Sequence, residues 1–260
     1  MIEKVHYLGF NMKFRLERHA DFSSFYQVFV EDSYPHLLNY IRKGDTVIDA
    51  GANIGIFTVI SSFITGDNGL IIAVEPDPEN KKILEKNISL NQLKNVIIVD
   101  KALYNISNTT VDLQSNGTMS HITRESEINS LVNFSRYSVK TITFDDLITD
   151  LNISPSILKM DIEGAEKFAL KGASKTLKKI KLLEAEIHDM ECEQELMKYN
   201  EFKFEISNAD NINKVLKFAF EHPFKTIKLE YNNNFETAKR MIGRRKSTDI
   251  HYPKIIYGTK

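Results

Sequence analysis

The chain has 260 residues, of which 42% are hydrophobic and 27% charged, a composition that is typical of a folded globular protein and excludes a disordered or coiled-coil one. Its 34 Lys and Arg residues nearly balance 35 Asp and Glu residues, so the formal net charge of -1 gives no overall attraction to nucleic acid or to an anionic membrane. The single cysteine, Cys192, excludes an internal disulfide framework and a cysteine-rich zinc site. The first residues contain no apolar run of signal-peptide or membrane-span length, so we expect a cytoplasmic protein with no membrane span.

The chain begins with a segment rich in aromatic residues. Residues 32–44 then predict a helix, with Pro35 in its first turn and Gly44 as its stop. We expect residues 1–43 to form an N-terminal segment with a cap helix, and residues 44–260 to form the main body of a single compact domain.

Strand-like and helix-like stretches alternate along the main body. The strand-like stretches are short, nearly continuous apolar runs, which is typical of a parallel sheet with helices on both faces. We therefore predict a doubly wound α/β fold. The predicted strands are residues 46–51, 70–75, 95–100, 157–161 and 181–189, and the predicted helices are residues 53–64, 78–93, 144–151 and a segment after Gly164.

Two stretches depart from this alternation. Residues 104–140 are polar and too long for a plain connection, and residues 109–114 and 137–142 alternate like the strands of a small hairpin that could cover a site. The last sixty residues hold strand-like residues 202–206, 226–231 and 254–258 and helix-like residues 211–222. They could complete the edge of the sheet, with an insertion between.

A glycine-rich turn follows the first predicted strand. In "VIDAGANIGIF", Asp49, Gly51 and Gly55 lie where the strand turns into its helix, a place where backbone N–H groups are exposed to a ligand. The Gly-x-x-x-Gly spacing lacks the third glycine of the dinucleotide fingerprint, which disfavours a nicotinamide cofactor. Glu75 ends the second strand, the position from which a carboxylate can accept both hydroxyls of a ribose. Although such glycines also occur as plain structural turns, their combination with Glu75 predicts an adenosine-containing ligand.

Charged residues alternate with apolar ones at the ends of two later strands. In "LKMDIEGAE", the charged side chains point to one face of the strand and the apolar ones to the other. The next strand shows the same alternation, so the two charged edges converge if these strands are adjacent and parallel. The first strand supplies Lys159, Asp161 and Glu163, and the second supplies Glu184, Glu186 and His188.

Four motifs together resemble the successive signatures of FkbM-type methyltransferases. They are "VIDAGANIG", "VEPDPENKKILEKNISLN", "TFDDL" and "ILKMDIEGAE", and the resemblance spans about Gly44 to His188. It implies the class I methyltransferase fold, a Rossmann-like sheet of seven mostly parallel strands in the order 3-2-1-4-5-7-6 with strand seven antiparallel. It also implies S-adenosylmethionine as the cofactor. The residues that would surround its methionine part are Asp49, Gly51, Asn53 and Gly55, while Glu75, followed by Pro76, would hold its ribose.

By the same resemblance, the charged strand end would line the active site. His188 is the expected general base, because an unperturbed histidine is largely neutral at pH 7, and Asp161 could orient the acceptor or contact the amino group of the cofactor. A structural alternative pairs Lys159 with Asp161 or Glu163, and lets Glu163 or Glu166 complement the following helix N-terminus. The carboxylates and the histidine could also hold Mg²⁺, but the positive charge of Lys159 on the same face argues against a metal.

Three functions fit these motifs. The leading hypothesis is O-methylation of a hydroxyl on a saccharide or another small polar metabolite. The basic cluster "KRMIGRRK", residues 239–246, raises RNA methylation as an alternative, although no recognisable RNA-binding module accompanies it. A non-catalytic module that binds an adenosine ligand is the third, since fold and ligand do not prove chemistry.

Overall fold

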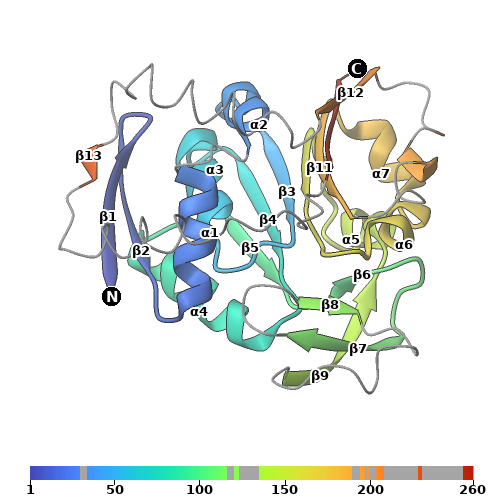
Figure 1. Cartoon of the computed structure of the whole chain (residues 1–260). Coiled ribbons are helices and arrows are strands. Elements are labelled where there is room, and N and C mark those ends of the chain that lie inside the picture. Colours follow the sequence, from blue (N-terminus) through green and yellow to red (C-terminus); the bar gives the residue numbers. More distant parts are fainter. Residues whose placement is uncertain are drawn as a thin grey trace.

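A seven-stranded sheet runs through the computed structural model, which describes residues 1–29, 34–115, 120–122, 135–188, 194–196, 198, 203–207, 228–229 and 254–259. The strand order is β12-β14-β11-β10-β3-β4-β5. Figure 1 labels β12, β11, β3, β4 and β5 in that order across the sheet. Their bounds are β3 Thr46–Ala50, β4 Leu70–Val74, β5 Val96–Val99, β10 Ile157–Met160, β11 Leu182–Ile187, β12 Lys203–Ser207 and β14 Lys254–Thr259.

The order of this sheet confirms the expected topology. Counted along the chain, its strands lie in the order 3-2-1-4-5-7-6, and the seventh, β14, runs antiparallel to both of its neighbours, β11 and β12. The other neighbouring pairs are parallel. The carboxyl ends of β3, β4, β10 and β11 therefore lie at one edge of the sheet, where a ligand site is expected.

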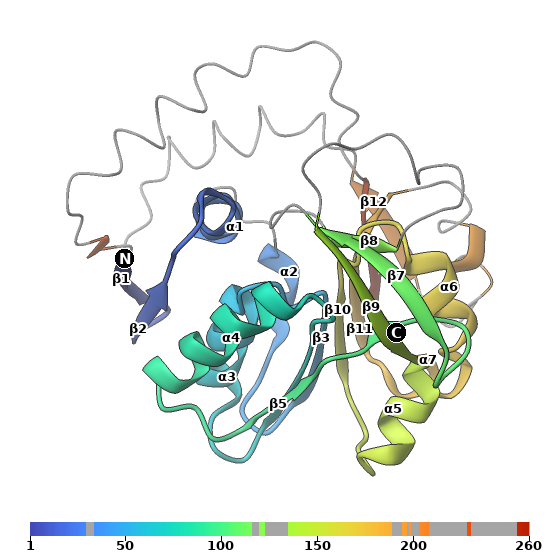
Figure 2. The same ribbon diagram turned by 90° about the horizontal axis from the view of Figure 1, so that it is seen from below.

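Helices cover both faces of the sheet, as Figure 2 shows from below. On one face lie α2 Pro35–Tyr40, α3 Ile56–Thr65 and α4 Pro78–Leu90. On the other lie α5 Phe144–Asp150, α6 Glu166–Lys171 and α7 Ser174–Lys179. The doubly wound α/β prediction is confirmed. None of the helices in the described ranges combines the length and the apolar character that crossing a bilayer requires.

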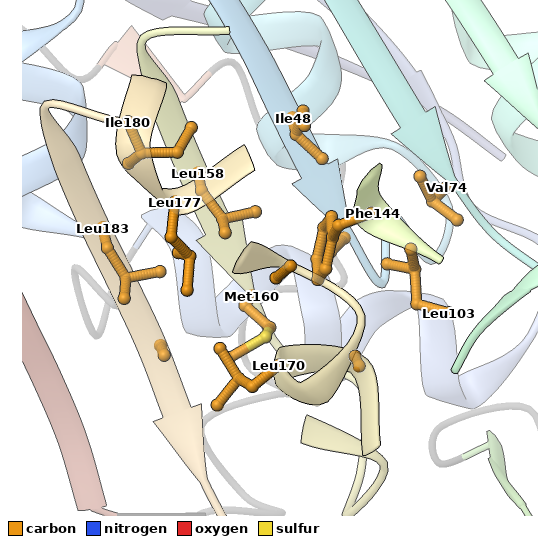
Figure 3. Close-up of a cluster of buried hydrophobic side chains, with 14 of the residues drawn as sticks. Ile48, Val74, Leu103, Phe144, Leu158, Met160, Leu170, Leu177, Ile180 and Leu183 are labelled. Atoms are coloured by element: carbon orange, nitrogen blue, oxygen red, sulfur yellow. The ribbon is translucent and has the colours of Figure 1, made fainter. Parts of the chain in front are cut away.

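The core beneath α5, α6 and α7 is close-packed and apolar (Figure 3). Ile48 of β3, Leu158 of β10 and Leu183 of β11 are fully buried there, against Phe144 of α5 and Leu177 of α7. Each such side chain contributes about 1.5–3 kcal/mol of transfer free energy on burial. Because Ile48, Leu158 and Leu183 face this core, the residues that alternate with them face α2 and α3.

An N-terminal hairpin, β1 Ile2–Tyr7 and β2 Phe10–Arg15, packs outside α3 and α4 together with α1 His19–Phe29. The side-chain oxygen of Asn87, on α4, accepts a hydrogen bond from the backbone N–H of Arg15 at 2.6 Å. Asn91 accepts from the N–H of Lys13 in the same way at 2.8 Å. The short strand β13 Lys228–Leu229 pairs with β1, so the predicted strand near residue 228 extends this hairpin rather than the main sheet.

The polar stretch forms the predicted hairpin. β7 Thr110–Ser115 pairs antiparallel with β9 Ser135–Ile142, and β6 Ala102–Leu103 and β8 Ser120–Ile122 complete a small sheet. The Ser115 hydroxyl donates a hydrogen bond to the buried Asp77 carboxylate, so this insertion is tied to the loop just after Glu75.

Two helix predictions need correction. The helix predicted over residues 32–44 comprises only Pro35–Tyr40 in the described structure, because Ile41 is extended, with ψ 133°, and ends it before Gly44. The helix after Gly164 is two short helices, separated at Gly172, where an added Cβ atom would lie 2.9 Å from Thr143 and from the Tyr104 carbonyl oxygen. The helix-like residues 211–222 and the basic cluster 239–246 lie outside the described residues.

Candidate functional site

The glycine turn after β3 packs directly on the end of β10. Gly51 has φ +77°, and a Cβ atom added there would lie 1.7 Å from the backbone oxygen of Asp161. The Gly51 N–H donates to the carbonyl of Val74 at 3.0 Å, which also ties the turn to β4. Only a residue without a side chain fits this three-strand junction.

The rest of the turn is also determined by contacts inside the protein. Gly55 has φ +85° and caps α3, and a Cβ atom there would lie 2.4 Å from Leu84 on α4. Asn53 has φ +51°, and its N–H donates to Glu75 Oε2 at 2.7 Å. The turn therefore brings its backbone to the carboxylate at the end of β4.

Glu75 is a buried acid between two backbone segments. Its Oε2 accepts from Asn53, and its Oε1 accepts from the Asp77 N–H at 2.8 Å. Burial raises the pKa of Glu75 to about 7, although these backbone hydrogen bonds oppose the rise. Pro76 follows it and is half-buried.

Three charged residues form a buried row across the sheet, on the face toward α2 and α3. Asp49, Lys159 and Glu184 are cross-strand neighbours on β3, β10 and β11. Lys159 Nζ lies 3.3 Å from Asp49 Oδ1 and donates to the Gly51 carbonyl at 2.7 Å. Glu184 Oε2 accepts from the Leu37 N–H of α2 at 3.1 Å.

Lys159 thus stabilises the glycine turn through its hydrogen bond to the Gly51 carbonyl. Burial alone would lower the pKa of Lys159, but the charges of Asp49 and Asp161 hold it above its usual value. The nearest carboxylate oxygen of Asp161 is 4.0 Å from Nζ, farther than that of Asp49. Asp49 is the nearer partner because it is the register neighbour of Lys159.

The charged residues beyond the row converge at the ends of β10 and β11. Asp161 Oδ2 accepts a hydrogen bond from the Tyr34 hydroxyl at 3.1 Å. Glu163, with φ +52°, places Oε2 3.4 Å from His188 Nε2. Ligand atoms of Asp161, Glu186 and His188 lie within 4.8 Å of one another. The structure therefore brings together the two charged edges that alternation predicted.

The proton affinity of this group is high. Burial, with the charge of Asp161 adding to it, raises the pKa of Glu163 to about 7 and that of Glu186 to about 9. Burial would lower the pKa of His188, but its hydrogen bond to Glu166 and the surrounding carboxylates raise it to about 10. The carboxylates around the ring therefore favour the protonated imidazole over the neutral one that we expected from the sequence.

Glu166 and Tyr34 are residues of this group that sequence reasoning did not place there. Glu166 is fully buried, and its Oε1 accepts from the N–H groups of Ile162 and Gly164 at 3.2 and 3.1 Å and contacts His188 Nδ1 at 2.9 Å. Glu166 is the last residue of the motif "KMDIEGAE". From that position we predicted its contact with backbone N–H groups but not its contact with His188. No local pattern pointed to Tyr34.

Comparisons with known proteins identify the family of this chain. The family model described as methyltransferase FkbM domain matches residues 49–221. The hexuronic acid methyltransferase AglP of Haloferax volcanii is 28% identical over 160 residues, which cover 58% of this chain and 59% of that protein. A ribosomal protein L11 methyltransferase of Listeria monocytogenes is 33% identical over 79 residues, 30% of this chain and 24% of that protein.

Among solved structures, a methyltransferase FkbM from Methylobacillus flagellatus superposes with a TM-score of 0.52 at 15% identity, over 90% of this chain and 47% of that one. This likeness supports the fold. The chain spans less than two thirds of the length of these relatives. Since the family model covers well over half of the 260 residues, the chain belongs to the FkbM methyltransferase domain family.

Proposed function

We propose that this chain is an S-adenosylmethionine-dependent methyltransferase that methylates a hydroxyl of a saccharide or another small polar metabolite. The observation that carries this proposal is the convergence of Asp161, Glu163, Glu186 and His188 beside the Gly51 turn, in a chain of the FkbM family. The name of the Haloferax relative, which acts on a hexuronic acid, supports a sugar acceptor.

The residues at the ends of β3 and β4 fit the cofactor. Each oxygen of the buried Glu75 carboxylate accepts one backbone hydrogen bond, which leaves lone pairs for ribose hydroxyls, with Pro76 beside them. The backbone at Gly51 and Asn53 would adjoin the methionine part. Asp49 and Gly55 act indirectly in this proposal, because Asp49 is paired with Lys159 and Gly55 packs on Leu84.

When bound, S-adenosylmethionine supplies a methyl group on a positively charged sulfur. The acceptor oxygen forms a bond to the methyl carbon as the carbon–sulfur bond breaks, and the electron pair of that bond stays on sulfur. The hydroxyl proton must go to the protein, and Glu163 is our candidate, because a carboxyl whose pKa is about 7 is partly ionised at neutral pH.

The neighbours of Glu163 have positioning roles in this mechanism. His188, held by the buried Glu166, contacts the Glu163 carboxylate and fixes its direction. Asp161, which accepts a hydrogen bond from Tyr34, would accept another from the acceptor. Lys159 supports the glycine turn without touching the acceptor.

A radiolabel assay tests the proposal. The purified chain is incubated with methyl-tritiated S-adenosylmethionine and, separately, a neutral oligosaccharide, a hexuronate-containing oligosaccharide and RNA. We expect label in a saccharide, and we expect it to survive mild alkali, since a methyl ether is stable where a methyl ester of the hexuronate carboxyl is hydrolysed. Alkali-labile label would overturn the hydroxyl as acceptor.

The variant Glu163→Gln keeps the size of the side chain and removes its capacity to accept a proton. We expect a fall in kcat of about 10²-fold or more, with S-adenosylhomocysteine affinity and thermal stability unchanged.

Two other outcomes of the radiolabel assay would support the alternative functions. Label that enters only RNA would support RNA methylation. S-adenosylhomocysteine binding without transfer to any class of acceptor would support the non-catalytic module.

A further inference from the structure

The carboxyl ends of β10 and β11 offer a set of donors that suits a metal ion. One oxygen each of Asp161 and Glu186 and one ring nitrogen of His188 lie within 4.8 Å of one another. Two carboxylate oxygens and one imidazole nitrogen are ligands that Mn²⁺ and similar divalent cations accept, and three protein ligands leave coordination positions open.

The charge of Lys159 is shared between this group and residues outside it. From the sequence we did not favour a metal, because Lys159 adds positive charge to the same face and would partly substitute for it. In the structure the Lys159 ammonium donates to the Gly51 carbonyl and pairs with Asp49, and it is 4.0 Å from the nearer Asp161 oxygen. Lys159 therefore offsets only part of the negative charge of Asp161, Glu163 and Glu186.

One oxygen of the group lacks a donor. Asp161 Oδ2 accepts from Tyr34, but Asp161 Oδ1 is buried and receives no hydrogen bond in the described structure. A buried carboxylate oxygen without a donor is costly, and a bound cation would satisfy it. This observation is independent of the spacing of the three ligands.

The histidine is oriented as metal-binding histidines commonly are. His188 Nδ1 contacts the buried carboxylate of Glu166 at 2.9 Å, which fixes the ring and directs Nε2 to the other side. A carboxylate on the far ring nitrogen is the usual outer support of a histidine ligand. Here Glu166 would give that support while it also holds the backbone of residues 162–164.

We propose that Asp161, Glu186 and His188 bind one divalent cation of the Mn²⁺ or Mg²⁺ class at the carboxyl ends of β10 and β11. His188 Nε2 would then bind the cation in place of its contact with Glu163, which frees the Glu163 carboxylate. The open coordination positions would take oxygens of the acceptor and lower the pKa of its hydroxyl. This role in turnover depends on the proposed function, whereas binding of the cation does not.

Mn²⁺ titration followed by electron paramagnetic resonance tests binding directly, because bound Mn²⁺ loses the six-line spectrum of the free ion. The chain is first treated with EDTA and then freed of it, with no methyl donor or acceptor present. We expect one Mn²⁺ per chain, and we expect Glu186→Gln and Asp161→Asn each to weaken binding about tenfold or more.

The matched control is Glu85→Gln, which removes one carboxylate from the exposed face of α4, where it pairs with Lys81 at 3.9 Å. We expect its affinity to equal that of the wild type. Circular dichroism of each variant checks that it is folded. Absence of saturable binding at millimolar Mn²⁺, or equal affinity in wild type and both ligand variants, overturns the site.

The two proposals can fail separately. Stoichiometric Mn²⁺ binding that the ligand variants weaken supports the site even if no acceptor is ever methylated. Full methyl transfer in EDTA by a chain that binds Mn²⁺ overturns the role of the cation in turnover but leaves methyl transfer intact.

Discussion

At the scale of single residues, two glycines with left-handed backbones meet different surroundings. A Cβ atom at Gly51 would lie 1.7 Å from the Asp161 carbonyl oxygen, whereas one at Gly44, with φ +85°, would meet nothing within 4 Å. Comparing the free energies of unfolding of the two alanine variants therefore separates the cost of steric contact from the cost of backbone strain.

We expect Gly44→Ala to lower the free energy of unfolding by about 1 kcal/mol, the cost of placing a side chain at positive φ. We expect Gly51→Ala to lower it by about 1–3 kcal/mol more, because β3 and β10 must also move apart. Urea denaturation of both variants measures the difference. Equal losses would show that the contact with Asp161 relaxes at no cost.

The ionisation of Glu75 predicts a pH-dependent affinity for the cofactor. Its pKa of about 7 means that the carboxyl is largely protonated below neutrality. Ribose hydroxyls donate best to the ionised form, so S-adenosylhomocysteine affinity should rise from about pH 6 and level off by about pH 8. Isothermal titration calorimetry across this range measures the profile.

The variant Glu75→Gln should abolish this rise and weaken binding by about 1.5–3 kcal/mol, or roughly tenfold to a hundredfold. Glu79→Gln, which alters an exposed carboxylate four residues later, is the matched control and should keep both the affinity and the profile. A wild-type profile in Glu75→Gln would remove Glu75 from the cofactor site.

At the scale of elements, the pairing of β3 with β10 contains an ion pair that is almost wholly buried. The side chains of Asp49 and Lys159 are 0% and 4% exposed. Removing one partner leaves the other charge buried without its nearest opposite charge, which typically costs about 3–5 kcal/mol. We therefore expect both Lys159→Met and Asp49→Asn to destabilise the chain strongly.

The double variant Asp49→Asn/Lys159→Met should lose clearly less stability than the sum of the single losses, because it leaves no unpaired charge. Urea denaturation of the four chains gives the coupling energy. Additive losses would mean that the two groups do not depend on each other, and Lys159 would then act chiefly through the Gly51 carbonyl.

Local sequence patterns correctly predicted which side of a strand each side chain faces, because that depends on one strand alone. Alternation in "LKMDIEGAE" correctly put Leu158 and Met160 in the core and the charges on the other face, and the two charged edges did meet. It could not identify Asp49 as the partner of Lys159, because that contact depends on register between strands 110 residues apart. The raised pKa of His188 was missed for the same reason, since Glu166 and the other carboxylates act together only in the folded chain.

At the scale of the whole molecule, the sheet depends on a strand from the far end of the chain. β14 lies between β11 and β12 and pairs with both. A chain that stops at residue 253 would leave β11 as an open edge, a ready template for pairing with other chains. We expect such a chain to melt at a lower temperature than the full chain and to aggregate in size-exclusion chromatography.

The matched control ends at residue 259 and keeps all of β14, so its melting temperature and elution should equal those of the full chain. If the shorter chain behaves identically, β14 contributes little to the stability of the sheet.

Family resemblance predicted the order of the sheet, which no periodicity could supply, because the order depends on which strands meet in space. Neither the family resemblance nor the sequence periodicity predicted the N-terminal hairpin β1–β2 or its pairing with β13. The buried Met12 and Phe14 alternate with polar residues, a readable strand signal, but the pairing of Val5 with Leu229 joins residues too distant for any local pattern.

The contact between Gly51 and the Asp161 carbonyl has a consequence for how two ligands are bound together. The turn that would adjoin the methyl donor and the strand end that would face the acceptor touch through their backbones, so neither can shift without displacing the other. Occupancy of one proposed subsite would therefore change the free energy of filling the second, and thermodynamic linkage would make this effect equal in both directions. The measured affinity for the methyl donor would then depend on whether the acceptor is bound, and the reverse.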